Sequence, residues 1–211
     1  MSKHDPYLYD DVDVLKNKLG IKDGELLAKR EVDITCRKIH QITETPIEGD
    51  YDFKHFCEFH AKIFNAVYEW AGLPRTVTIN KAEKSLAWQS IEYTKPSNIE
   101  SEATIVLQKM ASLDWDSMNT DEKATELSRS MADLWKIHPF REGNTRTTIT
   151  FVCQFAESKG IFLKREIFEK NAAYMRAALV AASAKFADID LRQPEHLFKI
   201  VRDSIERGET F

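Results

Sequence analysis

The spacing of apolar residues along the chain is mostly that of amphipathic helices. Between residues 121 and 137, for example, apolar side chains recur every three or four positions, which places them on one helix face. Similar segments follow one another along the chain, and most glycines and prolines fall between them. The pattern predicts helices over residues 11–19, 23–44, 52–70, 97–113, 121–137, 144–159, 165–186 and 193–207. We therefore expect an all-α fold.

One segment, residues 74–93, departs from the helical period. Residues 75–79 alternate and are rich in β-branched side chains, a polar turn follows, and residues 86–88 are again largely apolar, which predicts a β-hairpin. A lone two-stranded hairpin is marginal unless it packs, and its exposed edge can pair with an extended peptide. Two interpretations of the hairpin tip, residues 81–86, stay open here: a binding element or a simple solvated turn.

Composition narrows the class of protein. The chain has 211 residues, of which 43% are hydrophobic and 30% charged, with a formal net charge of −4. A net negative charge does not favour nonspecific binding to nucleic acid. No apolar run approaches the roughly 18 residues of a membrane span, and no secretory leader is recognisable. We expect a single domain spanning residues 1–211, with no nucleic-acid partner and no membrane contact.

The cysteines favour a reducing compartment. Cys36, Cys57 and Cys153 are odd in number and widely spaced, with neither a disulfide nor a metal-binding pattern. Cys57 and Cys153 fall within predicted helices and are interpreted as small core residues. We therefore expect a cytoplasmic protein, although composition does not exclude export by a specialised secretion system.

The densest cluster of reactive side chains lies in one loop between two predicted helices. Residues 138–146 read His-Pro-Phe-Arg-Glu-Gly-Asn-Thr-Arg. Pro139 disfavours the α conformation at His138 and ends the incoming helix, so the imidazole is presented from a helix end. Phe140 is apolar in a polar stretch, and we expect its ring to fix the loop by packing into the core.

The second half of the loop has the composition of a phosphate site. The next helix is expected to begin near Asn144, a good cap, with Gly143 allowing close backbone approach. Free amide groups at a helix start attract anions, and Arg146 adds a bidentate cation. Glu142 would repel phosphate unless a divalent cation bridges them, and Mg²⁺ commonly takes only one or two protein carboxylates. His138 can accept a proton from an attacking hydroxyl, so the loop predicts a nucleotide site with a general base.

The loop resembles the active-site signature of the Fic family, His-Pro-Phe-x-(Asp/Glu)-Gly-Asn-(Gly/Lys)-Arg. Upstream, residues 5–9 (Asp-Pro-Tyr-Leu-Tyr), 15–21 (Leu-Lys-Asn-Lys-Leu-Gly-Ile) and 67–72 (Val-Tyr-Glu-Trp-Ala-Gly) resemble landmarks of bacterial Fic proteins. The resemblance covers about residues 5–205. It implies a Fic-type helical bundle with a small β-hairpin flap at about residues 74–93.

The resemblance implies transfer of AMP from ATP to a Ser, Thr or Tyr hydroxyl of a target protein. His138 would be the base that deprotonates the target, and Glu142 would hold Mg²⁺ on the α- and β-phosphates. The nucleotide-binding residues would be Gly143, Asn144, Thr145, Arg146 and Thr147, with Asn144 on the α-phosphate and Arg146 on the distal phosphates. The flap residues that register the target would be Lys81, Ala82, Lys84, Ser85 and Leu86.

The chain departs from the family pattern at two positions. Thr145 stands where the family usually has Gly, and Ile149 stands where many members have a second Arg that contacts the γ-phosphate and answers an inhibitory Glu. The inhibitory motif, (Ser/Thr)-x-x-x-Glu-(Gly/Asn), is not found, because neither Glu48-Gly49 nor Glu142-Gly143 has Ser or Thr four residues before the Glu.

Three consequences for regulation stay open. The chain resembles members restrained by a separate small antitoxin, or it has been trimmed, or it is not restrained in this way. The N-terminal Asp-Pro-Tyr segment favours the antitoxin by analogy. The same analogy reaches effectors with a Fic domain ahead of a secretion module.

Other interpretations of the sequence remain alongside AMP transfer. One is a Fic-fold transferase with another donor, such as UTP or a phosphocholine carrier, and another is a nucleotide-binding module with weak or no transferase activity. Outside the loop, His40, His55 and His60 share no metal-ligand spacing and are interpreted as structural or surface residues.

Overall fold

The computed structural model describes residues 5–83, 86, 88, 90–186 and 189–208. The described α-helices are α1 (Gly24–Glu44), α2 (Phe53–Phe64), α3 (Ile99–Ser112), α4 (Thr120–Ile137), α5 (Asn144–Ser158), α6 (Glu166–Lys170), α7 (Ala172–Ser183) and α8 (Glu195–Gly208). Short 3₁₀ helices, η2 (Pro96–Asn98) and η3 (Trp115–Ser117), precede α3 and α4. The chain therefore folds mainly as helices, as the apolar spacing predicts.

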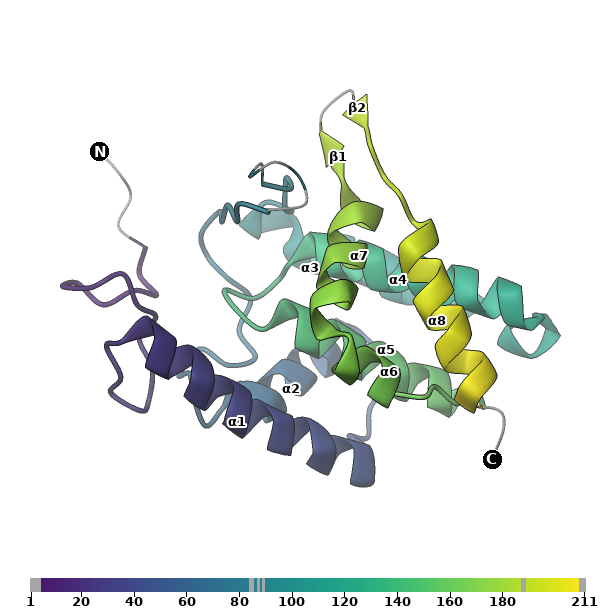
Figure 1. The fold of residues 1–211 in the computed structure, drawn as a ribbon, viewed down its shortest axis with the longest axis horizontal. Coiled ribbons are helices and arrows are strands. Elements are labelled where there is room, and N and C mark those ends of the chain that lie inside the picture. Colours follow the sequence, from purple (N-terminus) through teal and green to yellow (C-terminus); the bar gives the residue numbers. More distant parts are fainter. Residues whose placement is uncertain (1–4, 84–85, 87, 89, 187–188, 209–211) are drawn as a thin grey trace.

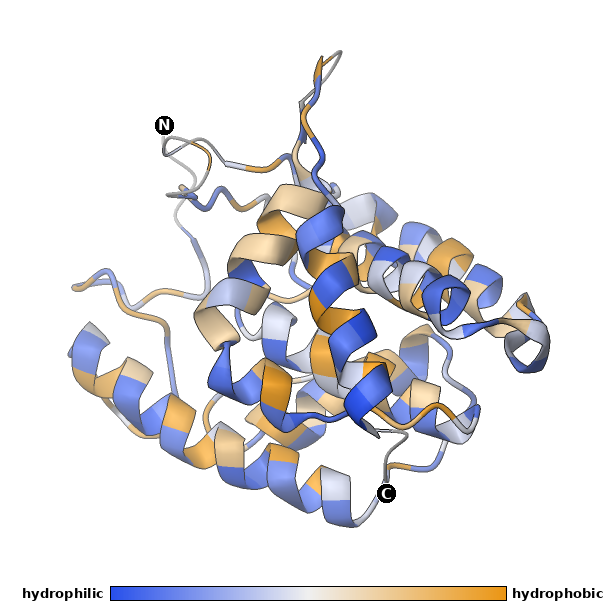
Figure 2. Ribbon diagram, turned by 45° about the vertical axis from the view of Figure 1, so that its right-hand side comes forward, coloured by the Kyte–Doolittle hydropathy of each residue, from blue (hydrophilic) through white to orange (hydrophobic). Residues whose placement is uncertain are grey.

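Helix α4 is the centre of the bundle. It packs against α3, α5, α7 and α8, while α2 packs against α5 and joins α1 to the bundle (Figure 1). The inward face of α4 is fully buried, with Leu127, Met131 and Leu134 among its core residues. Figure 2 shows apolar and polar residues alternating around α1 and α8, as expected of helices with one face on a core.

Side-chain caps fix where three of the predicted helices begin. Asn119 accepts a hydrogen bond from the Glu122 amide while the Glu122 carboxylate accepts one from the Asn119 amide, which is a capping box at the start of α4. Asp23 and Asp52 cap α1 and α2 in the same sense. The observed starts lie within one residue of the predicted ones.

The predicted helix over residues 11–19 is wrong. Instead the chain turns back on itself, with an antiparallel bridge between Leu8 and Leu15. The Tyr9 amide donates to the Val14 carbonyl at 3.0 Å, and the Lys16 amide donates to the Tyr7 carbonyl at 2.8 Å. Aspartates at 10, 11 and 13 explain the failure, because aspartate favours turns over helix interiors.

Two other helices are shorter than predicted. The helix expected over residues 52–70 ends at Phe64 and turns follow to residue 73, so residues 67–72 lie outside it. The helix expected over residues 165–186 breaks at Asn171, whose backbone (φ −117°, ψ 31°) leaves the helical region. Its second part, α7, ends at Ser183.

The strand predictions need a correction as well. Within the described part of residues 74–93, antiparallel pairing consists of one isolated bridge between Ala82 and Ser90, without regular strands. The regular hairpin lies elsewhere: β1 (Lys185–Phe186) pairs with β2 (Ile189–Asp190) and projects from the bundle (Figure 1). We keep the name flap for residues 74–93, whose inner side is buried at Ile79, Ile91 and Tyr93.

No helix in the described part of the chain is both long and apolar enough to cross a membrane.

Candidate active site

The loop between α4 and α5 is built by two residues with positive φ. His138 ends α4 in the left-handed region (φ 51°), and Pro139 follows it, as the sequence predicts. Gly143 (φ 83°) is the N-cap of α5, and a Cβ at this position would lie 2.3 Å from Cζ of Phe64. Position 143 therefore requires glycine for its backbone conformation and for its contact with Phe64.

Phe140 fixes the middle of the loop. Its ring is fully buried and stacks on the His60 imidazole, with ring centroids 3.8 Å apart. The Asn144 side chain closes the loop by accepting a hydrogen bond from the Phe140 amide at 2.9 Å and donating to the Phe140 carbonyl at 2.7 Å. Helix α5 begins at Asn144 as expected, but the prediction that Asn144 is its cap is corrected, because this side chain faces back into the loop.

His138 presents a neutral imidazole with one free lone pair. Its Nδ1 lies 3.0 Å from the Trp135 carbonyl, which can only accept, so Nδ1 carries the proton and Nε2 is left as an acceptor. Nε2 is buried and has no hydrogen-bond partner among the described residues. Burial lowers the pKa of His138 well below its ordinary value, with Lys81 and Arg176 acting in the same direction. At neutral pH the His138 imidazole is therefore uncharged, and no donor of the described residues occupies its Nε2.

Glu142 is an ionised carboxylate with a cation beside it. Lys81 Nζ donates to Glu142 Oε2 at 2.9 Å, and the Gly143 amide donates to Oε1 at 2.9 Å. Burial raises the pKa of Glu142, but Lys81 and the Gly143 amide outweigh it and lower the pKa to about 2. A hard, ionised oxygen ligand that already attracts a cation fits the chemistry of a Mg²⁺ site. The described residues contain no cluster of three or more metal-ligating side chains, so other ligands would come from phosphate and water.

Thr145 and Arg146, in the first turn of α5, are both held by neighbouring elements. The Trp135 indole donates to Thr145 Oγ1 at 2.9 Å, so a threonine in this position is accommodated against α4. The Arg146 guanidinium pairs with Glu31 on α1, donates to Thr35 Oγ1 at 2.8 Å and lies over the Phe64 ring. Both residues also line a pocket beside the loop.

A pocket of about 560 Å³ brings most of the predicted site together. The predicted residues that line it are Lys81, His138, Glu142, Gly143, Asn144, Thr145 and Arg146. Ile149 also lines the pocket, together with Val32, Cys36 and Ile39 from α1. The pocket therefore combines a base, an ionised carboxylate and cations with an apolar side facing α1.

The other predicted site residues either do not line this pocket or lie outside what the structure describes. Thr147 is fully buried and donates to the Gly143 carbonyl at 3.0 Å. Ala82 is exposed and does not line the pocket, and Leu86 packs against the core. Lys84 and Ser85 lie outside the described residues.

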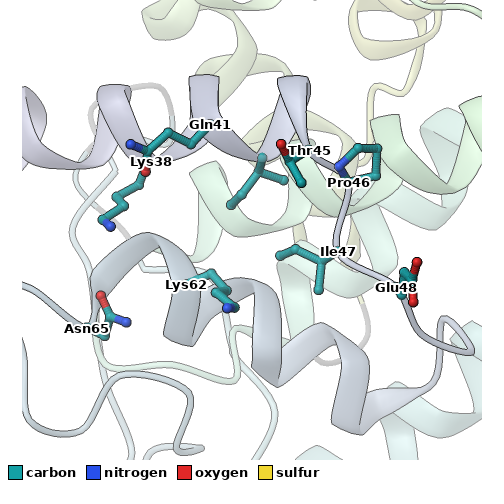
Figure 3. A pocket seen from close by; sticks show the side chains of 9 residues that line it. Lys38, Gln41, Thr45, Pro46, Ile47, Glu48, Lys62 and Asn65 are labelled. Atoms are coloured by element: carbon teal, nitrogen blue, oxygen red, sulfur yellow. The ribbon is translucent and has the colours of Figure 1, made fainter.

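A different pocket, of about 590 Å³, opens between α1 and α2. Figure 3 shows Lys38 and Gln41 on α1 across from Lys62 on α2 and Asn65, which directly follows α2. None of the predicted site residues lines this pocket. The chemistry is therefore concentrated at the loop.

Comparison with known proteins places the loop in a family. Residues 50–156 match the Fic/DOC family model, a span that includes the whole loop. The chain is 30% identical over 167 residues to the probable protein adenylyltransferase y4lH of Sinorhizobium fredii, covering 78% of this chain and 82% of that protein. The chain belongs to the Fic/DOC family.

Other Fic relatives and solved structures agree with this fold. Protein adenylyltransferase VbhT of Bartonella schoenbuchensis is 33% identical over 169 residues, 80% of this chain, and the chain spans 34% of its length. The structure of BepC from Bartonella tribocorum, solved with bound AMPPNP, superposes with a TM-score of 0.77 at 19% identity, covering 94% of this chain and 95% of that one. The described helices thus have the arrangement of Fic domains.

The Fic loop depends on residues that its motif does not include. The sequence indicates only a structural or surface role for His60. This residue is buried, and its Nδ1 accepts a hydrogen bond from the Gly72 amide at 2.8 Å. The proton of the ring is therefore on Nε2, which donates to the Glu142 carbonyl at 3.0 Å. Burial lowers the pKa of His60 to about 3. The signal in the sequence is its position on the apolar face of a predicted helix, which indicates burial but not the partner.

Arg75 is the second unpredicted support of the loop. It is buried, its Nε donates to the His138 carbonyl at 2.8 Å, and its amide donates to the Pro139 carbonyl at 2.7 Å. The same guanidinium donates to the carbonyl of Val77 in the flap and to that of Thr94, the residue that directly follows the flap. Arg75 thereby joins the flap to the loop.

The N-terminal segment has a structural role in the site. Asp5 accepts hydrogen bonds from the Arg141 guanidinium at 2.9 Å, and the Tyr7 ring meets the Trp70 ring edge-on at 5.5 Å. Residues 5–9, part of the family resemblance, thus fix Arg141 of the loop from outside.

Proposed function

We propose that the chain transfers AMP from ATP to the hydroxyl group of a Ser, Thr or Tyr side chain on a target protein. The observation that carries this proposal is the unpartnered Nε2 of His138, among the described residues, beside the first turn of α5. A base on the wall of a pocket that also holds an anion-attracting helix start suits the attack of a hydroxyl on a phosphorus atom. The names of the Fic relatives support the same chemistry.

In this proposal each residue has a distinct task. His138 Nε2 takes the proton of the target hydroxyl, whose oxygen forms a bond to the α-phosphorus while the bond from that phosphorus to the bridging oxygen breaks and pyrophosphate leaves. The backbone amides of Asn144 and Thr145 bind the α-phosphate oxygens and Gly143 allows their close approach, because the Asn144 side chain and the Gly143 amide are already bonded within the loop. Arg146 binds the distal phosphates.

Glu142 is the residue that would hold Mg²⁺ in the proposed complex. The ion, when bound, would neutralise phosphate charge that the carboxylate alone would repel. Lys81 occupies the cation position on this carboxylate in the structure described, so it must yield its contact to a metal.

The partners remain part of the proposal. The target is a protein with an accessible hydroxyl that pairs with the flap, and a separate antitoxin would restrain the enzyme. The chain spans about a third of the length of VbhT, and the proposed reaction is that of this domain alone. Export as an effector would be compatible with the fold shared with BepC.

Labelling with ATP carrying ³²P at either the α or the γ position tests the reaction. The purified protein is incubated with a lysate, Mg²⁺ and each form of ATP, and labelled protein bands are compared between wild type, His138→Ala and a control, His196→Ala, on α8. Kinases of the lysate label proteins from γ-labelled ATP by themselves, so a lysate incubated without the protein gives the background. Above this background we expect bands from α-labelled ATP alone, at least about 100-fold weaker in His138→Ala and unchanged in His196→Ala. Bands from γ-labelled ATP that need the wild-type protein and are lost in His138→Ala would contradict AMP transfer.

A second candidate is favoured by the apolar side of the pocket. Ile149, Val32 and Ile39 line the same pocket as Arg146 and give it an apolar wall. A Fic-fold transferase with another nucleotide or phosphodiester donor would fit this feature. Competition of unlabelled UTP, CDP-choline and ATP against α-labelled ATP distinguishes the donors, because only the preferred donor suppresses the label at the lowest concentration.

A further inference from the structure

Arg146 is the cation of the α5 start, and it is held from α1 and α2. Its Nη2 pairs with the Glu31 carboxylate, its Nη1 donates to Thr35 Oγ1 at 2.8 Å, and its guanidinium carbon lies 4.8 Å from the centre of the Phe64 ring. Glu31 and Thr35 lie one turn apart on α1, outside residues 50–156 that match the family model. A support for the site therefore comes from an element that the sequence motif does not include.

The partners of Arg146 lie behind it with respect to the pocket. Arg146 lines the pocket, whereas Glu31, Thr35 and Tyr68 do not. The exposed fraction of the side chain is 27% for Arg146 and 8% for Glu31. The ion pair thus leaves part of the guanidinium facing the pocket, and Glu31 is not placed to occupy the position of a ligand.

The opposite arrangement occurs at the ion pair between Lys81 and Glu142. Both of these residues line the pocket, so their contact occupies space that a ligand or metal would use. A bound anion must compete with the Lys81–Glu142 pair, but it can add to the Glu31–Arg146 pair. The difference in position, not in charge, separates a support from a competitor.

Glu31 is itself fixed by a second donor. The Tyr68 hydroxyl donates to Glu31, and the pKa of Tyr68 is raised by burial and by the neighbouring Glu31 carboxylate, so this hydroxyl keeps its proton. A guanidinium has five N–H donors in a rigid plane. Because the two terminal nitrogens of Arg146 contact Glu31 and Thr35 and one face of its guanidinium lies over Phe64, the remaining N–H donors of Arg146 have a defined direction.

We propose that Glu31 is a positioning residue that holds the Arg146 guanidinium toward the pocket, where it binds the distal phosphates of a nucleoside triphosphate. The inference rests on the proposed function, in which Arg146 binds those phosphates. In this chain Ile149 stands at the position of a second motif arginine, so Arg146 is the arginine that the first two turns of α5 supply. Arg165 and Arg176 also line the pocket, but they come from other elements, and the direction of Arg146 decides which donors the start of α5 offers to the distal phosphates.

The test compares triphosphate with monophosphate binding. Dissociation constants of ATP and AMP are measured by isothermal titration calorimetry with Mg²⁺ for wild type, Glu31→Gln, Thr35→Val, Arg146→Ala and a control, Asp33→Asn. Asp33 is exposed on the same helix, so its variant removes the same charge without touching Arg146. Circular dichroism of each variant reports whether it is folded.

We expect Glu31→Gln to raise the dissociation constant of ATP about ten-fold, which corresponds to the loss of one charged hydrogen bond, and to leave the dissociation constant of AMP unchanged. Thr35→Val removes the neutral acceptor of Arg146 and a donor to the Glu31 carbonyl, and it should weaken ATP binding by about three-fold. This variant tests the inference if Glu31→Gln fails to fold. Asp33→Asn should bind both as wild type does. Equal weakening of ATP and AMP would make the role of Glu31 merely structural, and tighter ATP binding would make Glu31 a competitor; either result overturns the inference.

Failure of the proposed function gives a different result. A wild type that does not bind ATP more tightly than AMP, or an Arg146→Ala variant that binds ATP normally, would remove the phosphate role of Arg146. A wild type that prefers ATP, an Arg146→Ala variant that loses the preference and a Glu31→Gln variant that keeps it would contradict the positioning role of Glu31 alone.

Discussion

The loop of residues 138–146 is fixed by buried contacts, whereas the flap of residues 74–93, beyond its buried anchor Arg75, contacts the residues of the same pocket through two ion pairs. Phe140 and Asn144 close the loop from inside, and His60 and Arg75 hold its carbonyls from outside. These four supports have little access to water. The loop geometry is therefore set before any ligand arrives.

The two ion pairs of the flap differ in exposure. The side chains of Lys81 and Glu142 are 19% and 33% exposed, whereas those of Glu83 and Arg176, 2.6 Å apart, are 8% and 39% exposed. An ion pair as exposed as Lys81–Glu142 contributes little to stability, typically about 0–1 kcal/mol. The difference teaches that the proposed catalytic groups lie on the rigid loop, while the part of the flap beyond Arg75 contacts Glu142 through an exchangeable ion pair.

The largest effect is expected where the two regions meet, at Arg75. In Arg75→Met the carbonyls of His138, Ile137, Val77 and Thr94 lose a buried donor. At about 1 kcal/mol for each unsatisfied group, the free energy of unfolding should fall by about 4 kcal/mol. Urea denaturation followed by circular dichroism measures it.

Arg202→Met on α8 is the matched control for Arg75→Met. Arg202 is partly exposed and paired with Asp121 and Glu206, so its loss should cost at most about 1 kcal/mol. Equal costs for the two variants would show that Arg75 does not join the flap to the loop.

The next largest effect is expected at Gly143. In Gly143→Ala the new Cβ would lie 2.3 Å from the Phe64 ring at a φ of 83°, which combines overpacking with backbone strain. We expect a loss of about 2–4 kcal/mol in the free energy of unfolding. Thermal and urea unfolding measure it.

Gly160→Ala separates the two causes. Gly160 has a similar φ of 71°, but no atom lies within 4 Å of the position that a methyl group would take, so the variant should lose only the strain, about 1–2 kcal/mol. If Gly143→Ala cost no more than Gly160→Ala, the contact with Phe64 would not limit position 143.

The loop could be predicted from the sequence because its chemistry is local. Pro139 fixes where α4 ends, glycine at 143 fixes the turn, and His138, Glu142 and Arg146 stand within one short segment. Their meeting in one pocket follows from the chain connection alone. The apolar period likewise predicts most helices, because it reports which face is buried.

The supports of the loop could not be predicted in this way because they are distant in the chain. Glu31 is 115 residues from Arg146, and Arg75 is 63 residues from His138. A buried charge in a sequence does not indicate its partner. The failed helix over residues 11–19 has a related cause, since the local preference of aspartate for turns won over an apolar spacing that spans only about two helical turns.

The pH dependence of stability should also come from the loop and not from the flap. His60 and His138 have lowered pKa values, so the unfolded chain binds protons that the folded one refuses as the pH falls below about 6.5. Stability therefore decreases toward acidic pH, by up to about 1.4 kcal/mol per pH unit for each such group. Urea unfolding between about pH 7 and pH 5, the range in which an unfolded histidine takes up its proton, measures the slope.

His60→Gln should lower that slope by the contribution of one group, whereas His40→Gln, at an exposed position of α1, should leave it unchanged. Glu142 does not contribute in this range, because its pKa of about 2 keeps it ionised throughout. Identical slopes for His60→Gln and wild type would show that burial of His60 does not exclude its proton.

The smallest effect on stability is expected at the ion pair between flap and loop. Lys81→Met removes the cation at 2.9 Å from Glu142, and the free energy of unfolding should change by less than about 1 kcal/mol because both partners are partly exposed. The pKa of Glu142 should rise from about 2 toward its ordinary value, since Lys81 is the largest of the groups that lower it. Carbon-13 NMR of the labelled carboxyl group follows this titration.

Lys62→Met on α2 provides the control, because it removes the same charge without a contact to Glu142. A small stability change with a large rise in the Glu142 pKa would mean that Lys81 acts on the charge of the site and not on its architecture. A loss of several kcal/mol would instead place Lys81 among the buried supports of the loop and erase the difference between the two regions. An unchanged Glu142 pKa would show that the flap does not hold its lysine on this carboxylate in solution.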